Sequence, residues 1–364
     1  MATRREVLRG AAALVCGVQI FPDDVFASDP LPRLFSAARI AGKDGGLLWR
    51  PSDMTLFPLP GRGHGLVPIA KGDKIIVTGR RPGGYVAIIN RASPDMAAQI
   101  APPAVGCRFS GHAAPEPGGN YFATSEFEAG TIRGAIVLRR AEDGSVCNRF
   151  DPQGIEPHDM LFAGDRLVVA LGGLTQDGGV AGPAFNPDGI DSSVVELEYP
   201  TGRIAARHRL SADLSTLSLR HMALAPDGAC VVVGMQDQDL SVTRPLMAVV
   251  TLGTGITPLP MPNPAQCNFR GYVGSVAVDA SGEFAAATSP RGSVIGIWSL
   301  SDRAWLAGFP VPDICGLAAG ATPGLFWATS GLGEVLKISI ASRQASIATR
   351  WSTHAGFDNH LLSV

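Results

Sequence analysis

The sequence predicts an all-β protein, a seven-bladed β-propeller whose last blade is closed by both ends of the chain. Three observations predict this fold. Short apolar strand-forming segments alternate with Gly- and Pro-containing turns, the segments recur every 41 to 63 residues, and an incomplete repeat stands at each end. The composition agrees, since 46% of the residues are hydrophobic while 44 Gly and 28 Pro are spread along the chain. The net charge of −2 offers no electrostatic reason to expect nucleic-acid binding.

The N-terminal segment has the pattern of an export signal and lies before the strand repeats of the fold. Residues 3–9, Thr-Arg-Arg-Glu-Val-Leu-Arg, form a twin-arginine pattern, followed by an apolar run over residues 10–20 and a small-residue site ending at Ala27. The apolar run is too short to span a bilayer stably. We therefore predict a twin-arginine signal peptide over residues 1–27 and a periplasmic mature chain, exported folded and without a stable membrane span.

Seven segment starts organise the mature chain. Each start except the last is followed by a second apolar strand, and a third follows in turn. The starts are separated by 48, 46, 63, 54, 41 and 44 residues. They are His64, His112, His158, His221, Ser275, Gly316 and His360.

The two ends of the chain complete each other. The last start stands in "NHLLSV", which ends the chain and is enough for a first strand alone, while "RLFSAARI", "GGLLWR" and "MTLFPLP" precede the first start without a first strand of their own. We predict one closure blade built from both ends, and a single domain over residues 28–364. Two β-sandwich domains are the alternative, but they account for neither the regular spacing nor the split repeat.

Histidine occupies the first-strand position in five of the seven repeats. The first strand of every propeller blade lines the central channel, so equivalent positions form a ring at its mouth. Neutral imidazole is the commonest protein ligand for iron, copper, zinc and nickel. We therefore predict a metal site, for iron or copper, where three of the histidines hold one ion. The candidate ligands are His64, His112, His158, His221 and His360. In the alternative interpretation each histidine is structural and bonds a neighbouring blade.

Charged and polar residues stand beside these starts. Carboxylates that bond imidazoles orient them and raise their basicity, and arginines attract anions. The same residues could equally form ordinary salt bridges between blades. The candidate ligand-binding residues are Arg62, Glu126, Glu156, Asp159, Arg220, Arg270 and Ser275.

The longest step, from His158 to His221, contains an irregular insert over residues 172–193 that we expect to fold over the histidine mouth. Asn186, Asp188 and Asp191 within it have no standard calcium-loop spacing. The chain has no Cys-x-x-Cys-His motif, hence no covalent c-type haem, and no phosphate-binding glycine loop, so no nucleotide site is expected.

Several ordered segments also resemble one bacterial family. They are "RGHG", "GHAAPEPGGNYFATSEFE", "GIEPHDMLFAGDRLVVALGGL", "SLRHMALAPDG", "GYVGSVAVDASGEFAAATSPRG", "CGLAAG" and "DNHLL". Together they resemble the twin-arginine-exported propellers known as domain of unknown function 1513. The resemblance implies a seven-bladed periplasmic propeller from a family whose genes lie near those for imelysin-type and dihaem peroxidase-like proteins. It implies a link to iron acquisition or redox systems, and it transfers no catalytic residue.

Three hypotheses of function follow. The leading one is a periplasmic propeller that binds a metal, iron first, or a metal complex, and serves a partner protein of an iron-uptake or redox system. The second is a metal-dependent oxidase or lyase acting on a small anionic substrate held by Arg220 and Arg270. The third is a protein-interaction scaffold whose histidines are structural.

Overall fold

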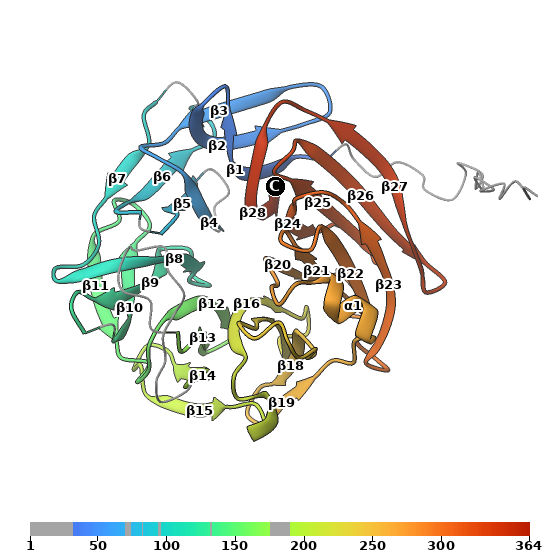
Figure 1. Cartoon of the computed structure of the whole chain (residues 1–364). Coiled ribbons are helices and arrows are strands. Elements are labelled where there is room, and N and C mark those ends of the chain that lie inside the picture. The colour runs from blue at the N-terminus through green and yellow to red at the C-terminus, as the bar shows by residue number, and fades with distance from the viewer. Residues whose placement is uncertain (1–31, 70–73, 82, 94–95, 132, 175–189) are drawn as a thin grey trace, which may run out of the picture. The chain divides into compact units, whose positions relative to one another are not determined.

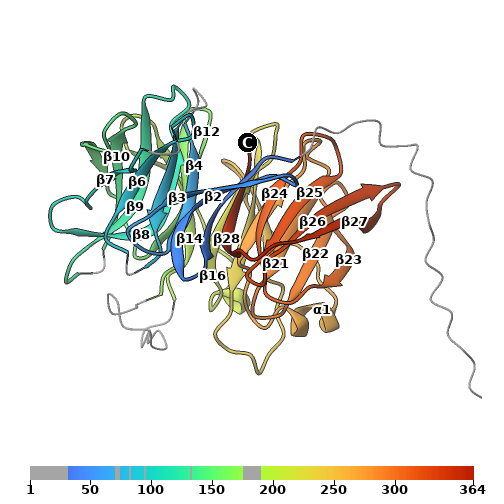
Figure 2. The same ribbon diagram turned by 90° about the horizontal axis from the view of Figure 1, so that it is seen from above.

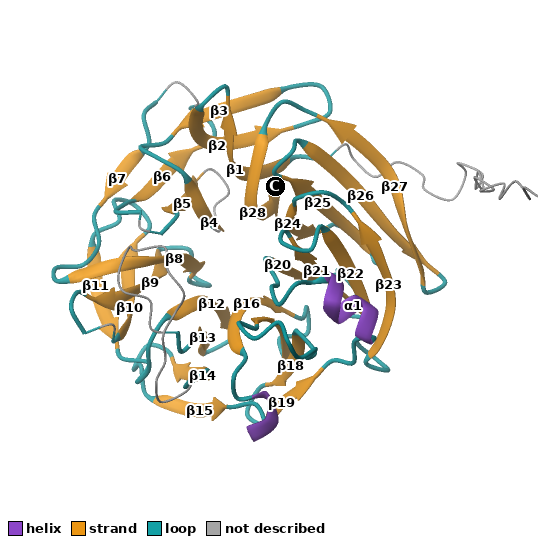
Figure 3. Cartoon of the chain, in the orientation of Figure 1, coloured by secondary structure: helices purple, strands orange, loops and turns teal. Residues whose placement is uncertain are grey.

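Seven four-stranded antiparallel sheets surround a central axis in the computed structural model (Figure 1). The structure describes residues 32–364 except 70–73, 82, 94–95, 132 and 175–189. Within these ranges the chain forms 28 strands, and Figure 3 shows how few residues are helical. In the edge view of Figure 2 the strands lean from one face of the ring toward the other. The predicted seven-bladed propeller is confirmed.

The first strand of each blade faces the axis. Seven strands share this position and surround the centre in Figure 1. They are β4 (Gly63–Pro68), β8 (Cys107–Pro115), β12 (Pro157–Ala163), β16 (Ser218–Leu224), β20 (Ser275–Val278), β24 (Ile314–Ala319) and β28 (Gly356–Ser363). Each begins at or near the start predicted from the repeat.

The other strands of each blade follow outward in chain order. Blades 1 and 2 add β5 (Lys74–Gly79), β6 (Val86–Asn90), β7 (Gln99–Ala101), β9 (Tyr121–Glu128), β10 (Gly134–Arg140) and β11 (Val146–Phe150). Blades 3 and 4 add β13 (Arg166–Leu171), β14 (Ser193–Glu198), β15 (Ile204–His208), β17 (Cys230–Gln236), β18 (Met247–Thr251) and β19 (Gly255–Pro258). Blades 5 and 6 add β21 (Phe284–Ser289), β22 (Val294–Ser299), β23 (Ala304–Pro310), β25 (Leu325–Ser330), β26 (Glu334–Ala341) and β27 (Gln344–Ser352).

The seventh blade joins the two ends of the chain as predicted. Its order is β28-β1-β2-β3, where β1 spans Leu34–Ile40, β2 Lys43–Trp49 and β3 Met54–Pro58. Strand β28 pairs antiparallel with β1, with Leu34 opposite Ser363, and the Val364 N–H donates to the Arg33 carbonyl at 2.8 Å. This pairing closes the ring.

Apolar side chains between neighbouring blades hold the ring together. At the junction of the closure blade and blade 1, buried Phe35 and Leu48 pack against Ile75 and Ile89. Similar clusters occur at the other junctions. Because the inner and middle strands are covered on both faces, they read as continuous apolar runs.

Two short helical elements among the described residues depart from the all-strand expectation. Helix α1 (Asn263–Asn268) and a single 3-10 turn (Ala212–Leu214) both lie between blades. Each is shorter than the window over which a helical periodicity can be read. No helix in the described ranges is long and apolar enough to cross a membrane. The predicted signal peptide, and most of the insert with Asn186 and Asp188, lie outside the described residues.

The closure blade generates a stability prediction. Replacing Leu361 on β28, which is 5% exposed, by Ala should lower the free energy of unfolding by about 2–5 kcal/mol, because a cavity opens in the blade core. Urea denaturation measures the change.

The matched control is Leu332→Ala, since Leu332 is 68% exposed; its expected effect is within about 0.5 kcal/mol. Equal, small effects of both substitutions would show that the last strand does not contribute to the folded ring.

Candidate metal centre

Five histidines from five inner strands meet in the middle of the ring. Their rings lie in mutual contact, with centroid separations from 4.6 to 5.4 Å. We call His64, His112, His158, His221 and His360 the histidine cluster. All but His360, which is partly exposed, are buried. We expected the imidazoles to form an open ring at the channel mouth. In the structure they pack against one another instead.

Each of these histidines stands where its strand stops pairing regularly with the next one. The register breaks between Gly63 and Leu66 on β4 and between Pro157 and Met160 on β12. Corresponding breaks on β8, β16 and β28 contain His112, His221 and His360. A β-bulge adds residues to one strand and re-aims a side chain, so the interruption turns each imidazole toward the axis.

Hydroxyl groups on the second strands replace the lost ladder partners. The Thr78 hydroxyl accepts from the Gly65 N–H at 3.0 Å and donates to the Gly111 carbonyl of the next blade. Ser125 likewise accepts from the His112 N–H at 3.2 Å and donates to the His112 carbonyl. These bonds satisfy buried backbone groups that would otherwise be left unpaired.

Blades 5 and 6 contribute no matching histidine. Strand β20 pairs regularly from Ser275, which is buried, onward. At Gly316 of β24 an added Cβ would lie 2.3 Å from the Thr329 hydroxyl, so a side chain there would require Thr329 to move. On this side Tyr272 approaches His221, with ring centroids 6.3 Å apart.

Four of the five histidines have the geometry of a ligand set. One ring nitrogen from each of His64, His112, His221 and His360 lies within 4.8 Å of the other three. In a four-coordinate site with metal–nitrogen bonds of about 2.0–2.1 Å, ligand nitrogens lie about 3.3–4.2 Å apart. The four nitrogens thus need to move by less than about 1 Å to close on an ion. We call these residues the four-histidine group.

Asp358 fixes the orientation of His64. The Nδ1 of His64 lies 2.8 Å from Oδ1 of Asp358, which is buried. Arg62 Nε donates to the same carboxylate at 2.6 Å and Arg80 Nη1 at 3.0 Å. These cations and His64 hold the pKa of Asp358 far below its ordinary value against the opposing effect of burial. The ionised carboxylate makes Nδ1 of His64 the donor, so the neutral form of this ring has its lone pair on Nε2.

A backbone carbonyl does the same for His221. Its Nδ1 lies 3.0 Å from the Val273 oxygen, which can only accept, so Nδ1 carries the hydrogen and Nε2 carries the lone pair. Metal-binding histidines are commonly oriented by such a carboxylate or carbonyl on the far nitrogen. Two of the four candidate ligands therefore present a lone pair set by the fold.

His112 lies at the centre of the cluster, in ring contact with the other four. Its Nε2 is 3.0 Å from Nε2 of His360, and its Nδ1 is buried without a hydrogen-bond partner. A buried polar atom without a partner is costly. The Nε2 atoms of His112 and His360 face each other, so a cation bound between them would be a partner for both lone pairs.

Burial keeps four of the five histidines uncharged. It lowers the pKa values of His112, His158 and His221 well below their ordinary range, and neighbouring imidazoles and Arg220 add to the effect. Burial, and then the neighbouring His64, lowers the pKa of His360 to about 3. Neutral imidazole is the form that binds metal ions, so the fold presents these rings in the binding-competent state at neutral pH.

A second charged network surrounds His158. Arg220 Nη2 lies 3.1 Å from Nδ1 of His158 and 3.0 Å from Oε1 of Glu156, all three side chains being buried. Arg81 approaches the same Glu156 oxygen at 3.6 Å. Glu156 also accepts the Leu174 N–H at 2.9 Å. The predicted residues Glu156 and Arg220 are therefore next to the histidine cluster, as Arg62 is through Asp358.

Three other predicted ligand-binding residues have no contact with the imidazoles in the described part of the chain. Glu126 is fully buried in blade 2, where it pairs with Arg139 at 2.6 Å. Asp159 accepts the backbone N–H groups of Met160 and Met222, both at 2.8 Å, and so joins blades 3 and 4. Arg270 is exposed, with a positive φ of 46°, just after α1.

The sequence interpretation missed Asp358 and Arg80, the residues that hold His64. A signal for Asp358 was present, because it stands two residues before His360 as Glu156 stands two residues before His158. No signal pointed to Arg80, whose role depends on the end of β5 reaching across to the closure blade.

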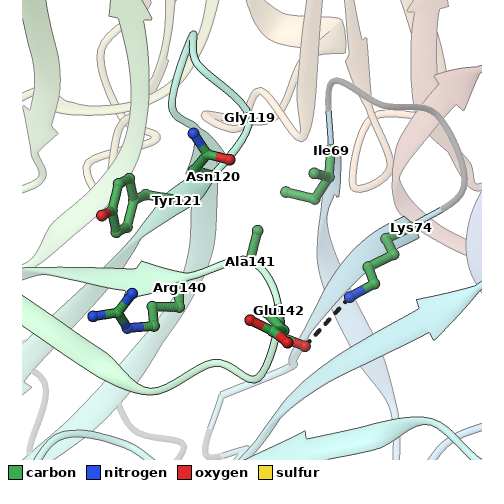
Figure 4. Close-up of a pocket in the computed structure, with 8 residues that line it drawn as sticks. All are labelled: Ile69, Lys74, Gly119, Asn120, Tyr121, Arg140, Ala141 and Glu142. Carbon is green, nitrogen blue, oxygen red and sulfur yellow. Dashed lines mark hydrogen bonds between the residues drawn. The ribbon is translucent and has the colours of Figure 1, made fainter.

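A pocket away from the cluster lies at the turns that follow the inner strands of blades 1 and 2 and at the turn between β10 and β11 (Figure 4). Its volume is about 480 Å³, and Lys74 donates across it to the Glu142 carbonyl at 3.3 Å. No histidine lines it. We assign it no function.

Comparison with known proteins identifies the family and finds solved structures with a similar fold. A family model described as "Protein of unknown function (DUF1513)" matches residues 57–364. No curated protein matches the sequence. The solved structure of Kuenenia stuttgartiensis hydrazine synthase is similar, with a TM-score of 0.59 and 11% identity over 92% of this chain and 99% of that chain. A chain in a structure titled "Crystal Structure of Mitotic Checkpoint Complex" has a TM-score of 0.59 and 10% identity over 93% of this chain and 87% of its own. At these identities the likeness concerns the fold alone.

The position of Glu126 gives one prediction. Glu126→Gln should lower the free energy of unfolding by about 3–5 kcal/mol, because it leaves the buried Arg139 charge uncompensated. Replacing both residues together, as Glu126→Gln with Arg139→Met, should recover most of the loss. Chemical denaturation of the single and double variants measures this, and a single variant as stable as the wild type would contradict the assignment.

The neutral cluster gives a prediction of pH dependence for the metal-free protein. The folded pKa values of His112, His158, His221 and His360 lie below the unfolded value of about 6.5. Unfolding therefore takes up protons below about pH 6.5, and stability falls as the pH falls. Burial raises the pKa of Asp159 to about 7, which offsets one of these four protons. The net loss is about 4 kcal/mol per pH unit between pH 6 and 5.

Urea denaturation at pH 7.5, 6 and 5 measures this slope. Replacing His112 and His360 together by Asn should remove about half of it or more, whereas replacing the exposed His354 by Gln should leave it unchanged. A wild-type stability that is flat from pH 7.5 to 5 would contradict the neutral cluster.

Proposed function

The chain belongs to the family described as "Protein of unknown function (DUF1513)", and within that family we propose that it binds one transition-metal ion at the four-histidine group. The convergence of four ring nitrogens within 4.8 Å carries the proposal. Support comes from the lowered pKa values of His112, His221 and His360, which keep these rings neutral. The outward hydrogen bonds of His64 and His221 add to it.

The donor set narrows the choice of ion. Four neutral imidazole nitrogens suit copper, zinc, nickel and iron, whereas magnesium and calcium require oxygen ligands. Among these ions we propose iron or copper for the physiological role. That choice rests on the family resemblance, which implies a link to iron acquisition or redox systems.

We also propose that the protein acts in the periplasm. The twin-arginine pattern at residues 3–9 favours export of the folded chain to the periplasm. There the protein would act as a binding component for a partner protein of an iron-uptake or redox system. A propeller suits this role because its rigid ring of blades holds the ligands while the outer faces remain available to a partner.

The enzyme hypothesis has less support. It requires Arg220 and Arg270 to hold one anionic substrate together. Arg220 is buried against Glu156 and His158, and Arg270 is exposed beyond α1. We therefore favour metal binding without turnover.

The test is metal analysis of protein recovered from the periplasm, followed by titration of the metal-free form with Cu²⁺, Zn²⁺, Ni²⁺ and Fe²⁺. We expect one ion per chain. Asp358→Asn should weaken binding by about 10–100-fold, because His64 loses the charged partner that orients it.

Asp151→Asn is the matched control, since Asp151 pairs with Arg133 on the surface and should leave the affinity unchanged. Replacing all four histidines by Gln should abolish binding. The proposal would be contradicted if the exported protein holds no metal and binds none of the four ions at micromolar concentration.

A further inference from the structure

The fifth imidazole, His158, differs chemically from the four-histidine group. Its Nε2 lies 3.3 Å from Nε2 of His221, and its ring centroid is 4.6 Å from that of His112. His158 nevertheless does not belong to the group whose ring nitrogens all lie within 4.8 Å of one another. Its neighbours on the far side explain what it does instead.

Arg220 determines which nitrogen of His158 carries the hydrogen. A guanidinium only donates, so its Nη2, 3.1 Å from Nδ1 of His158, requires Nδ1 to accept. The hydrogen of the neutral ring then resides on Nε2. Glu156 holds Arg220 in place at 3.0 Å, and both side chains are buried. An Nε2 that carries a hydrogen has no lone pair for a metal ion.

In the metal-free protein this N–H has an acceptor. His221 donates from Nδ1 to the Val273 carbonyl, so its Nε2 offers a lone pair to His158. That lone pair is the one His221 would give to the ion. Metal binding would therefore leave the buried His158 N–H without a partner, which is costly unless another acceptor takes its place.

We propose that His158 donates its Nε2 hydrogen to a small anion bound to the metal ion as an added ligand. The inference rests on the proposed function, because it requires an ion on the four-histidine group. It makes His158 a ligand-selecting residue, and Arg220 and Glu156 the positioning residues that fix its tautomer. The ligand class is a small anion with a lone pair close to the metal, for which azide is a suitable probe.

The experiment separates metal binding from anion binding. Full-length mature protein is loaded with Cu²⁺, and its stoichiometry and affinity are measured before azide is titrated by its charge-transfer absorption. His158→Phe removes the N–H and keeps a planar ring. We expect one Cu²⁺ per chain with an affinity within about threefold of wild type, and an azide affinity lower by about tenfold, the effect of one hydrogen bond to a charged acceptor. His354→Phe, at an exposed site, should change neither.

Two results with the variant would overturn the inference. Unchanged azide affinity with intact Cu²⁺ binding would show that His158 does not contact the anion. A Cu²⁺ affinity lowered 100-fold or more would make His158 a metal ligand. Wild-type protein that binds no Cu²⁺ and no other ion would overturn the proposed function and this inference with it.

A second measurement needs no variant. Nitrogen-15 NMR of the metal-free wild-type protein distinguishes the two neutral tautomers of each imidazole. We expect the hydrogen of His158 on Nε2, and those of His64 and His221 on Nδ1. A hydrogen on Nδ1 of His158 would contradict the role assigned to Arg220.

Discussion

The centre of this protein depends on one departure from regular strand pairing. On five inner strands the ladder to the second strand is interrupted where the histidine stands. Regular pairing would alternate these side chains between the two faces of a blade. The interruption instead turns them toward the axis, and hydroxyls such as those of Thr78 and Ser125 satisfy the backbone groups that it frees. Ring closure then brings together residues as far apart in the chain as His64 and His360.

The polar groups behind the rings decide what the convergence can do. Asp358 and the Val273 carbonyl take the outward hydrogens of His64 and His221, so their lone pairs point inward. Arg220 reverses this arrangement at His158, so that a hydrogen points inward there. The five imidazoles therefore differ in role. His64 and His221 direct lone pairs at the position of an ion, and His158 directs an N–H at the space beside it. Burial keeps the rings of His112, His158, His221 and His360 neutral.

Much of this architecture could be predicted from the sequence, and some of it could not. The spacing of the starts and the split last repeat predicted seven blades and the closure by both ends, because propeller blades repeat at nearly constant length. The shared position of the five histidines predicted their convergence. Glu126 was expected near them and is instead the buried partner of Arg139, since sequence proximity to a start does not reveal which face of the strand a side chain takes. The distinct role of His158 depends on a contact with Arg220 across 62 residues, which no spacing reveals.

The central claim is that four imidazoles on the axis form one metal site. Anomalous X-ray diffraction from crystals soaked in a transition-metal salt tests this most directly. We expect one strong peak within about 2.0–2.2 Å of one ring nitrogen from each of His64, His112, His221 and His360, with His158 outside bonding distance. A peak held by other residues, or no peak at the cluster with the five rings still in mutual contact, would contradict it.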